Sequence, residues 1–328
     1  MSKHNRSDSI KSILVFGAKD HIGSRVVQYL AEHAPLVKIR VATHKAEHLV
    51  TLQEMFPFAE AVVADFLDLP SLTVAVDGMD GIFQISPDVF DEDLLVENMA
   101  KACQRAGTVR HIIRILGMPP GATQDTVAES LRPYRHYPAM QHMVAMELYQ
   151  SAGLPVTFLN VAGYYMDDFS RMFSQPILQE RTIRVAFDKR LAWIHPKDVA
   201  DVAAELLLRD PAESVGQLLH LTGKDLCRIS EVADLFSEVL GVTVEYDGDE
   251  DNFYRAIKPV FSQLWGEDAP EYFMTYFSWE TSHDYLFHLT HHVEEILGRP
   301  PISFRRWIAE TRDFFVSHWE SAGMLEPA

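Results

Sequence analysis

The first half of the chain alternates short apolar runs with longer amphipathic runs. The apolar runs predict strands over residues 13–16, 37–43, 61–64, 81–86, 111–116 and 156–160. Runs with apolar positions at helical spacing lie between them and predict helices over residues 24–33, 92–106 and 140–151. Strands that alternate with helices form parallel sheets with helices on both faces. The pattern therefore predicts an α/β fold, with a doubly wound parallel sheet over residues 1–160.

The first strand leads into the first helix through a turn that contains glycine. Gly17 allows a sharp turn, and Gly23 allows the helix to pack closely on the strand. The N-terminus of such a helix offers unpaired N–H groups and a positive dipole end, which favour a diphosphate. The usual fingerprint has three glycines, and Asp20 stands where the middle one is often found. The turn predicts a dinucleotide site that Asp20 weakens or reshapes; a purely structural turn is the alternative.

Ligands of parallel sheets bind beyond the carboxyl ends of the strands. The expected cofactor-binding residues near these ends are Gly17, Lys19, Asp20, His21, Ile22, Thr43, His44, Lys45, Asp65, Phe66, Ile85, Ser86 and Leu116. The end of the second strand has no carboxylate to accept a hydrogen bond from the ribose 2′-hydroxyl of NAD. Arg40, His44 and Lys45 could instead meet a 2′-phosphate, which favours NADP(H) and leaves NAD(H) possible. The alternative places Arg40 against a helix or solvent and the other two in a solvated loop.

The second half of the chain changes character. Strands are expected over 182–186, 218–222 and 242–246, with a helix from about 196 and another over 229–240. We expect residues 182–225 to return to the main sheet, and residues 161–181 and 226–328 to form a smaller, mostly helical substrate region. Residues 252–318 are rich in aromatic side chains, which either form a core or close over an apolar substrate.

Composition narrows the class of partner. The formal net charge of −18 over 328 residues argues against nucleic acid or an anionic membrane surface as partner. No apolar run approaches the roughly 20 residues that span a bilayer. Cys103 and Cys227 have no metal-site spacing, which favours a cytoplasmic protein. His288 and His292 stand at helical i,i+4 spacing without an accompanying motif, so we expect no metal and a small-molecule substrate.

Several segments together resemble one protein family. They are residues 13–23, 65–72, 146–159, 162–168, 193–203 and 292–301, with Phe304 and Trp307 beyond them. In this order and spacing they resemble the NmrA-like group of atypical short-chain dehydrogenase/reductases over nearly the whole chain. The resemblance implies a Rossmann domain, a small C-terminal domain and usually NADP(H). It does not fix the activity, because members include reductases of quinones, aromatics and carbonyls as well as redox-sensing regulators.

The chain departs from the usual Tyr-x-x-x-Lys pair of short-chain dehydrogenases. Tyr134 and Tyr137 are followed four residues later by Pro138 and Gln141, and no lysine occurs from residue 102 through 188. Met143 stands where the family's helix often carries a lysine, so we place it near the cofactor. The expected catalytic residues are instead His136, His142, Tyr137 and Tyr164.

Three functions fit these residues. The first is an NADPH-dependent reductase of a small apolar, aromatic or conjugated compound, since a strongly electrophilic acceptor needs little help from an acid. The second is a non-catalytic regulatory protein that senses NAD(P). The third is a non-redox isomerase or lyase with a histidine general base.

Overall fold

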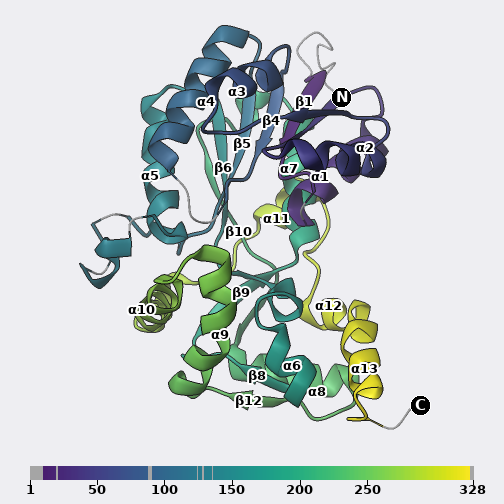
Figure 1. Cartoon of the computed structure of the whole chain (residues 1–328), viewed down its shortest axis with the longest axis vertical. Coiled ribbons are helices and arrows are strands. Elements are labelled where there is room, and N and C mark those ends of the chain that lie inside the picture. The colour runs from purple at the N-terminus through teal and green to yellow at the C-terminus, as the bar shows by residue number, and fades with distance from the viewer. Residues whose placement is uncertain are drawn as a thin grey trace.

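A seven-stranded parallel sheet forms one half of the molecule. Figure 1 shows the computed structural model, which describes residues 10–19, 21–87, 91–123, 125–127, 129–134 and 136–325. The strands are β1 (Ser12–Phe16), β2 (Lys38–Thr43), β3 (Glu60–Val63), β4 (Gly81–Gln84), β5 (His111–Leu116), β6 (Val156–Val161) and β10 (Leu218–Leu221). Their order is β10-β6-β5-β4-β1-β2-β3. The chain adds β2 and β3 on one side of β1 and then β4 and the later strands on its other side, so the strand order reverses between β1 and β4. This reversal is the point at which such sheets bind ligands.

Helices cover both faces of this sheet (Figure 1). On one face lie α3 (Leu69–Val76), α4 (Glu92–Ala106) and α5 (Pro138–Ser151). On the other lie α1 (His21–His33), α2 (Leu49–Met55), α7 (Pro196–Leu208) and α11 (His292–Leu297). The prediction of a doubly wound Rossmann sheet is confirmed. Most bounds agree within one or two residues, except that α1 begins three residues earlier than expected, at His21, directly after the turn.

The second region is smaller and contains two small sheets besides its helices. β7 (Tyr164–Tyr165), β9 (Arg190–Ile194) and β11 (Asp225–Arg228) form a three-stranded sheet, and β8 (Thr182–Arg184) pairs with β12 (Glu245–Asp247). The helices are α6 (Ser174–Glu180), α8 (Ile229–Leu240), α9 (Glu250–Trp265), α10 (Ala269–Thr281), α12 (Phe304–Glu310) and α13 (Arg312–Ser321). Among the described residues, no helix has the length and apolar content needed to cross a membrane.

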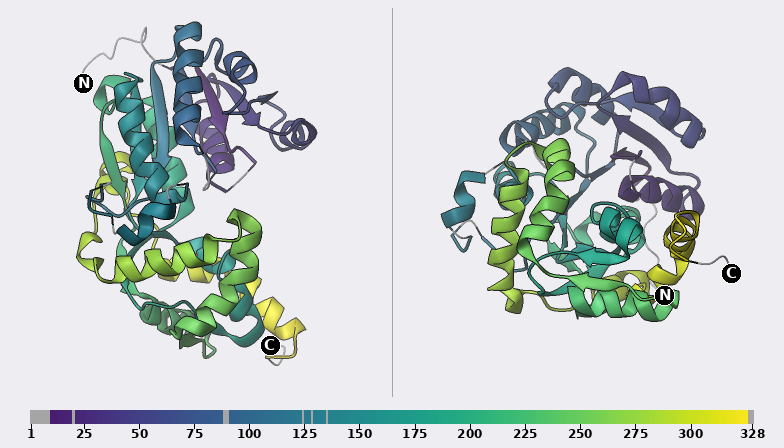
Figure 2. Two further views of the ribbon diagram at one scale, coloured as in Figure 1. Left: turned by 60° about the vertical axis from the view of Figure 1, so that its left-hand side comes forward. Right: turned by 60° about the horizontal axis from the view of Figure 1, so that its bottom comes forward.

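The return to the main sheet is narrower than the expected residues 182–225. Of residues 182–225, α7 and β10 lie on the main sheet, whereas β8 and β9 pair inside the second region. From the expected substrate region, α11 also packs on the main sheet, with Val293 buried in the same core as α7. The strand expected over 182–186 was assigned to the main sheet because a short segment does not reveal its partner, and the strand β9 was not predicted. Figure 2 shows the two regions meeting at the carboxyl ends of the main strands.

The aromatic residues of the second half mostly form its core. Phe169 is fully buried and its ring packs within 6 Å of the rings of Trp193, Phe236 and Phe304. A charged pair lies inside this apolar environment: Lys189 bonds Glu280 of α10, and both side chains are at most 2% exposed. The Lys189 ammonium also lies 3.8 Å from the centre of the Phe277 ring.

The β1–α1 turn depends on a close approach of backbone to backbone. A Cβ atom on Gly23 would lie 2.2 Å from the carbonyl oxygen of Gly17, a distance that requires the backbone to move. We therefore predict that Gly23→Ala lowers the free energy of unfolding by about 2 kcal/mol or more. Gly117→Ala is the control, because its Cβ would meet the His142 ring at an ordinary 3.6 Å. Equal urea midpoints for the two variants would contradict this description of the turn.

The buried pair in the second region generates a second prediction. Replacing one partner leaves the other charge buried without compensation, so Lys189→Met is expected to lower the free energy of unfolding by about 3–5 kcal/mol. The double variant Lys189→Met/Glu280→Gln removes both charges and is expected to lose less than the single variant. Arg306→Met, which breaks an exposed pair with Glu310, is expected to change stability by about 0.5 kcal/mol at most. Urea unfolding measures the free energy of unfolding of all three variants. A double variant that is less stable than Lys189→Met would contradict the description of Lys189 and Glu280 as a mutually compensating buried pair.

Candidate functional site

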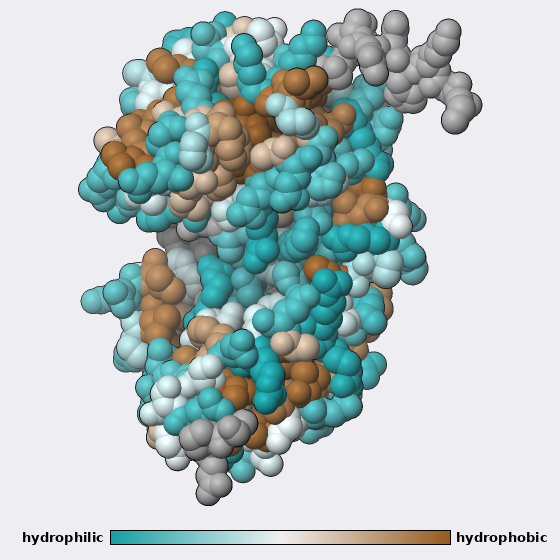
Figure 3. Space-filling model, turned by 90° about the vertical axis from the view of Figure 1, so that its right-hand side faces the viewer, coloured by the Kyte–Doolittle hydropathy of each residue, from teal (hydrophilic) through white to brown (hydrophobic). Residues whose placement is uncertain are grey.

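The carboxyl ends of the main strands face the second region across a narrow part of the molecule, the waist. We call the hollow at the waist the crevice. Figure 3 shows this waist as a hollow rimmed mostly by hydrophilic residues. The segment just after β6 crosses it, because β6 ends at Val161 and β7 follows at Tyr164 in the second region. From this segment, Tyr165 and Arg171 reach His21, the first residue of α1. The waist therefore brings residues of both regions to the switch point of the sheet.

The turn at the switch point has the backbone that a diphosphate site needs. Gly17 adopts φ +66°, and a Cβ there would lie 2.6 Å from Cγ2 of Ile85. Ile85 thus packs over the turn from the end of β4, as expected of a residue at the switch point. Ile22 is buried and anchors the first turn of α1 in the core. Asp20 lies outside the described residues.

The His21 side chain lies in a charged environment at this turn. Arg171 donates a hydrogen bond from Nη1 to Nε2 of His21, at 3.0 Å, and Tyr165 packs edge-on at 5.5 Å. Asp167 is 3.9 Å from the same ring nitrogen, and its buried Oδ1 has no hydrogen-bond partner. Burial, reinforced by Arg171 and Arg25, lowers the pKa of His21 to about 3, so the ring is neutral at pH 7. Burial also raises the pKa of Asp167.

A basic cluster lies at the ends of β1 and β2. Lys19 Nζ is 3.4 Å from Nε2 of His48, and Nδ1 of His48 is 3.5 Å from the Thr43 hydroxyl. Thr43 also accepts a hydrogen bond from the Lys45 amide. His44 and Lys45 are exposed beside them. Two cations, two imidazoles and a hydroxyl at this edge fit a phosphate on the ribose. One carboxylate also reaches the cluster, since Oε1 of the exposed Glu47 lies 3.8 Å from Nε2 of His48.

Arg40 does not belong to this cluster. It pairs with Glu60 at 2.9 Å and donates to the backbone carbonyls of Ala75 and Asp77 beyond the end of α3. It therefore ties β2 and β3 to a helix C-terminus. This is the alternative given above, in which Arg40 lies against a helix and not at a 2′-phosphate. The carbonyls of a helix C-terminus attract a cation, which accounts for this placement.

The other expected cofactor residues divide into accessible and buried groups. Asp65 and Ser86 are partly exposed at the ends of β3 and β4, and Phe66 packs on Phe16 at 4.5 Å. Leu116 and Met143 are at most 2% exposed and belong to the core between the sheet and the α3–α5 face. These two are corrected to core residues, because apolar side chains at the ends of β5 and inside α5 pack inward.

A buried polar network holds Ser86 in place. Arg114 of β5, fully buried, pairs with Glu92 at 2.5 Å and donates to the Ser86 hydroxyl at 2.7 Å. Ser86 in turn donates to Glu92 at 2.9 Å. The network fixes the start of the β4–α4 connection, so Ser86 is held at the crevice edge by its partners in the core.

The structure places the four expected catalytic residues in different surroundings. His142 of α5 lies at the carboxyl end of β5, with Nδ1 2.8 Å from the amide nitrogen and 2.9 Å from the oxygen of Gly117. His136 is exposed just before α5. Tyr137 stacks on Tyr272 of α10 at 4.6 Å, and burial raises its pKa. His142 is thus the one of these three whose ring is anchored at a strand end.

Tyr164 faces the core of the second region. Its hydroxyl donates to Glu280 at 2.8 Å and lies 3.5 Å from Nζ of Lys189. Burial and the neighbouring Glu280 raise its pKa well above the usual value. A tyrosine and a lysine do meet in this protein, but within the aromatic core and away from the Tyr-x-x-x-Lys spacing.

Three residues at these sites were not predicted from the sequence. His48 and Arg171 lie in segments without a motif, and Lys189 lies in the link between two small sheets. The sequence offered one signal only, for Lys189, which is the first lysine after the stretch from residue 102 through 188 that has none. The contacts of all three depend on tertiary structure.

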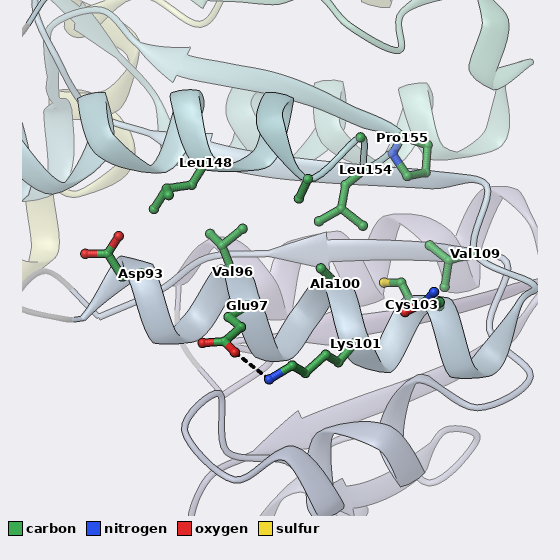
Figure 4. A pocket seen from close by; sticks show the side chains of 13 residues that line it. Asp93, Val96, Glu97, Ala100, Lys101, Cys103, Val109, Leu148, Leu154 and Pro155 are labelled. Atoms are coloured by element: carbon green, nitrogen blue, oxygen red, sulfur yellow. Dashed lines mark hydrogen bonds and ion pairs between the residues drawn. The ribbon is translucent and has the colours of Figure 1, made fainter.

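A second, open groove lies away from the crevice. Figure 4 shows it between α4 and α5, with a volume of about 670 Å³ and an exposed pair of Glu97 and Lys101. Val109 and Pro155, which line it, directly precede β5 and β6. It therefore lies toward the amino ends of the strands, opposite the ligand-binding edge.

No metal site accompanies the crevice in the described part of the chain. No group of three His, Cys, Asp or Glu side chains is placed there to hold an ion. Nδ1 of His288 lies 2.9 Å from the carbonyl of Leu286, and Nδ1 of His292 lies 2.9 Å from that of His220. Both histidines thus contact backbone.

Comparison with known proteins agrees with this geometry. The chain is 25% identical over 304 residues to a (4-alkanoyl-5-oxo-2,5-dihydrofuran-3-yl)methyl phosphate reductase of Streptomyces griseus, covering 92% of this chain and 99% of the relative. It is 27% identical over 236 residues to an NAD(P)H azoreductase of Xenophilus azovorans, covering 71% and 76%. The crystal structure of Citrobacter sp. triphenylmethane reductase complexed with NADP(H) superposes with a TM-score of 0.72 at 19% identity, over 92% and 99%, and shows the shared fold. The NmrA-like family profile matches residues 9–285, and the chain belongs to the NmrA-like family.

Proposed function

We propose that this protein is an NADPH-dependent reductase of a small aromatic or conjugated compound. The observation that carries the proposal is the glycine turn at the start of α1, placed at the switch point with a basic cluster at the neighbouring strand end. The two relatives support the same chemistry, since one is named a reductase and the other an NAD(P)H azoreductase.

The crevice residues fit each part of the cofactor. The turn from Gly17 to Ile22 would hold the diphosphate on the first amides of α1. Lys19, Thr43 and His48 would hold the 2′-phosphate, with His44 and Lys45 adding positive charge. Asp65 and Phe66 would border the adenine, and Ile85 and Ser86 would border the centre of the cofactor. When bound, NADPH supplies the hydride.

The substrate would lie between the end of β5 and helix α10. Aromatic rings of both regions gather there: Tyr134 and Tyr137 pack on Tyr272, which stacks on Tyr276 at 5.6 Å. Trp279 continues this row of rings. Tyr137, Tyr272, Tyr276 and Trp279 are buried in this row, so the partly exposed Tyr134 would offer the flat apolar contact to an aromatic or conjugated compound.

His142 is the proposed proton donor for a carbonyl substrate. Gly117 holds its Nδ1 and so fixes the plane of the ring at the strand end. A protonated imidazole can release a proton to a developing alkoxide. A quinone accepts the hydride without such help, because the charge that forms on it is delocalised.

Cofactor preference tests the basic cluster. We predict that the full-length protein binds NADPH at least tenfold more tightly than NADH, because charge-assisted bonds to the 2′-phosphate contribute about 1.5–3 kcal/mol each. His48→Ala is expected to reduce the preference severalfold, whereas the exposed His318→Ala leaves it unchanged. Isothermal titration measures both affinities. Equal binding of the two cofactors by the unaltered protein would contradict the assignment of the cluster.

Acceptor dependence tests His142. In NADPH oxidation assays, His142→Ala is expected to lower turnover of aromatic carbonyls by about 10²- to 10⁴-fold and to leave quinone turnover nearly unchanged. His318→Ala serves as the control, and unchanged turnover is expected because this exposed side chain lies on α13 in the second region. Equal loss on both acceptor classes would contradict the role of His142. Tight NADPH binding without turnover of any acceptor would instead favour a cofactor-sensing regulator.

A further inference from the structure

Arg171 holds an unusual position for a cation in so acidic a protein. It belongs to the second region, yet its guanidinium contacts the His21 ring at the start of α1. Neither Arg171 nor Arg25 has a carboxylate within 4 Å among the residues that the structure describes, whereas Arg40 binds one and Arg184 and Arg299 bind two each. The guanidinium of Arg171 therefore donates its hydrogen bond to a neutral imidazole, which is a weaker partner for a cation than a carboxylate or phosphate is.

The surroundings of Arg171 favour an anion. The first amides of α1 and the positive end of its dipole lie at the same turn. Arg25 follows His21 by one helical turn and contributes to the positive field at the His21 ring. Asp167 is the one carboxylate within 4 Å of that ring in the described chain, and its Oδ1 is buried without a hydrogen bond. Among the described residues, Arg171, Arg25 and the helix dipole thus face one carboxylate at this ring, and that carboxylate is imperfectly satisfied.

The position of Arg171 is fixed by the second region. It directly follows the short helical turn Met166–Ser170, which Phe169 anchors in the aromatic core. Its backbone N–H bonds the carbonyl of Asp168, which is buried. An anion held by both Arg171 and the turn at α1 would therefore connect the two regions.

We infer that Arg171 is a clamp for the cofactor diphosphate, delivered from the second region, and that cofactor binding fastens the segment 164–171 over the crevice. The inference rests on the proposed function. In it, the guanidinium leaves the His21 ring for the diphosphate oxygens, which a planar fork of N–H groups fits well. Asp167 opposes the clamp, since its carboxylate lies beside the same ring and repels an incoming diphosphate.

Affinity for two probes tests the clamp. The full-length protein and its Arg171→Gln variant are titrated with NADPH and with adenosine 2′-phosphate, which lacks the diphosphate. Arg171→Gln is expected to weaken NADPH binding about 10- to 100-fold and adenosine 2′-phosphate binding about twofold at most. Arg171→Lys is expected to fall between, because it keeps the charge but loses the fork. Arg305→Gln, which removes an exposed charge paired with Glu238, is the control and is expected to bind as the unaltered protein does.

Two further measurements separate a clamp from a structural role. Asp167→Asn is expected to tighten NADPH binding about two- to fivefold, a direction that a merely damaged fold does not produce. NADPH is also expected to slow amide hydrogen exchange over residues 164–173 in the unaltered protein and not in Arg171→Gln. Unchanged NADPH affinity in Arg171→Gln would overturn the clamp and leave the proposed function standing. Failure of the unaltered protein to bind either probe would overturn the proposed function, and the clamp with it.

Discussion

The site depends on the absence of a side chain at Gly23. Because α1 approaches the carbonyl of Gly17 so closely there, the helix begins directly at the carboxyl end of β1 and points its first amides into the waist. A longer turn or a displaced helix would bury these amides or turn them toward solvent. The positions of His21, Ile22 and Lys19 all follow from this one contact, and the second region closes against the same helix end.

Electrostatics explains how a protein with a net charge of −18 can hold a multiply charged anion. The crevice gathers Lys19, Lys45, Arg25 and Arg171 with the helix dipole. Two carboxylates lie beside them, Glu47 at 3.8 Å from His48 and Asp167 at 3.9 Å from His21. Burial keeps the His21 imidazole neutral, so it accepts a hydrogen bond from Arg171 and does not add to the repulsion between neighbouring cations. These nearby charges, more than the net charge of the molecule, set the field that a cofactor meets.

Sequence patterns predicted the main sheet well, because its central strands β1, β4, β5 and β6 are buried and mostly apolar. The crossover helices α1 and α4 carry an apolar face. Helix 92–106 and strand 111–116 were predicted to the residue. The short strand β8 was misassigned to the main sheet and β9 was not predicted, since a few residues do not reveal their partners. Motifs found the turn at Gly17 but not Arg171 or His48, whose roles arise from contacts between segments far apart in the chain or outside any motif. Arg40 shows the opposite error: the sequence offered it as a partner for the 2′-phosphate because it lies on β2, but its guanidinium already binds carbonyls at the C-terminus of α3.

A crystal structure of the protein with NADP⁺ tests the central claim most directly. The account predicts diphosphate density at the first amides of α1 between Gly17 and Ile22, with the guanidinium of Arg171 turned from the His21 ring toward the phosphate oxygens. Diphosphate density elsewhere, or an Arg171 guanidinium that stays on the His21 ring at saturating cofactor, would contradict it.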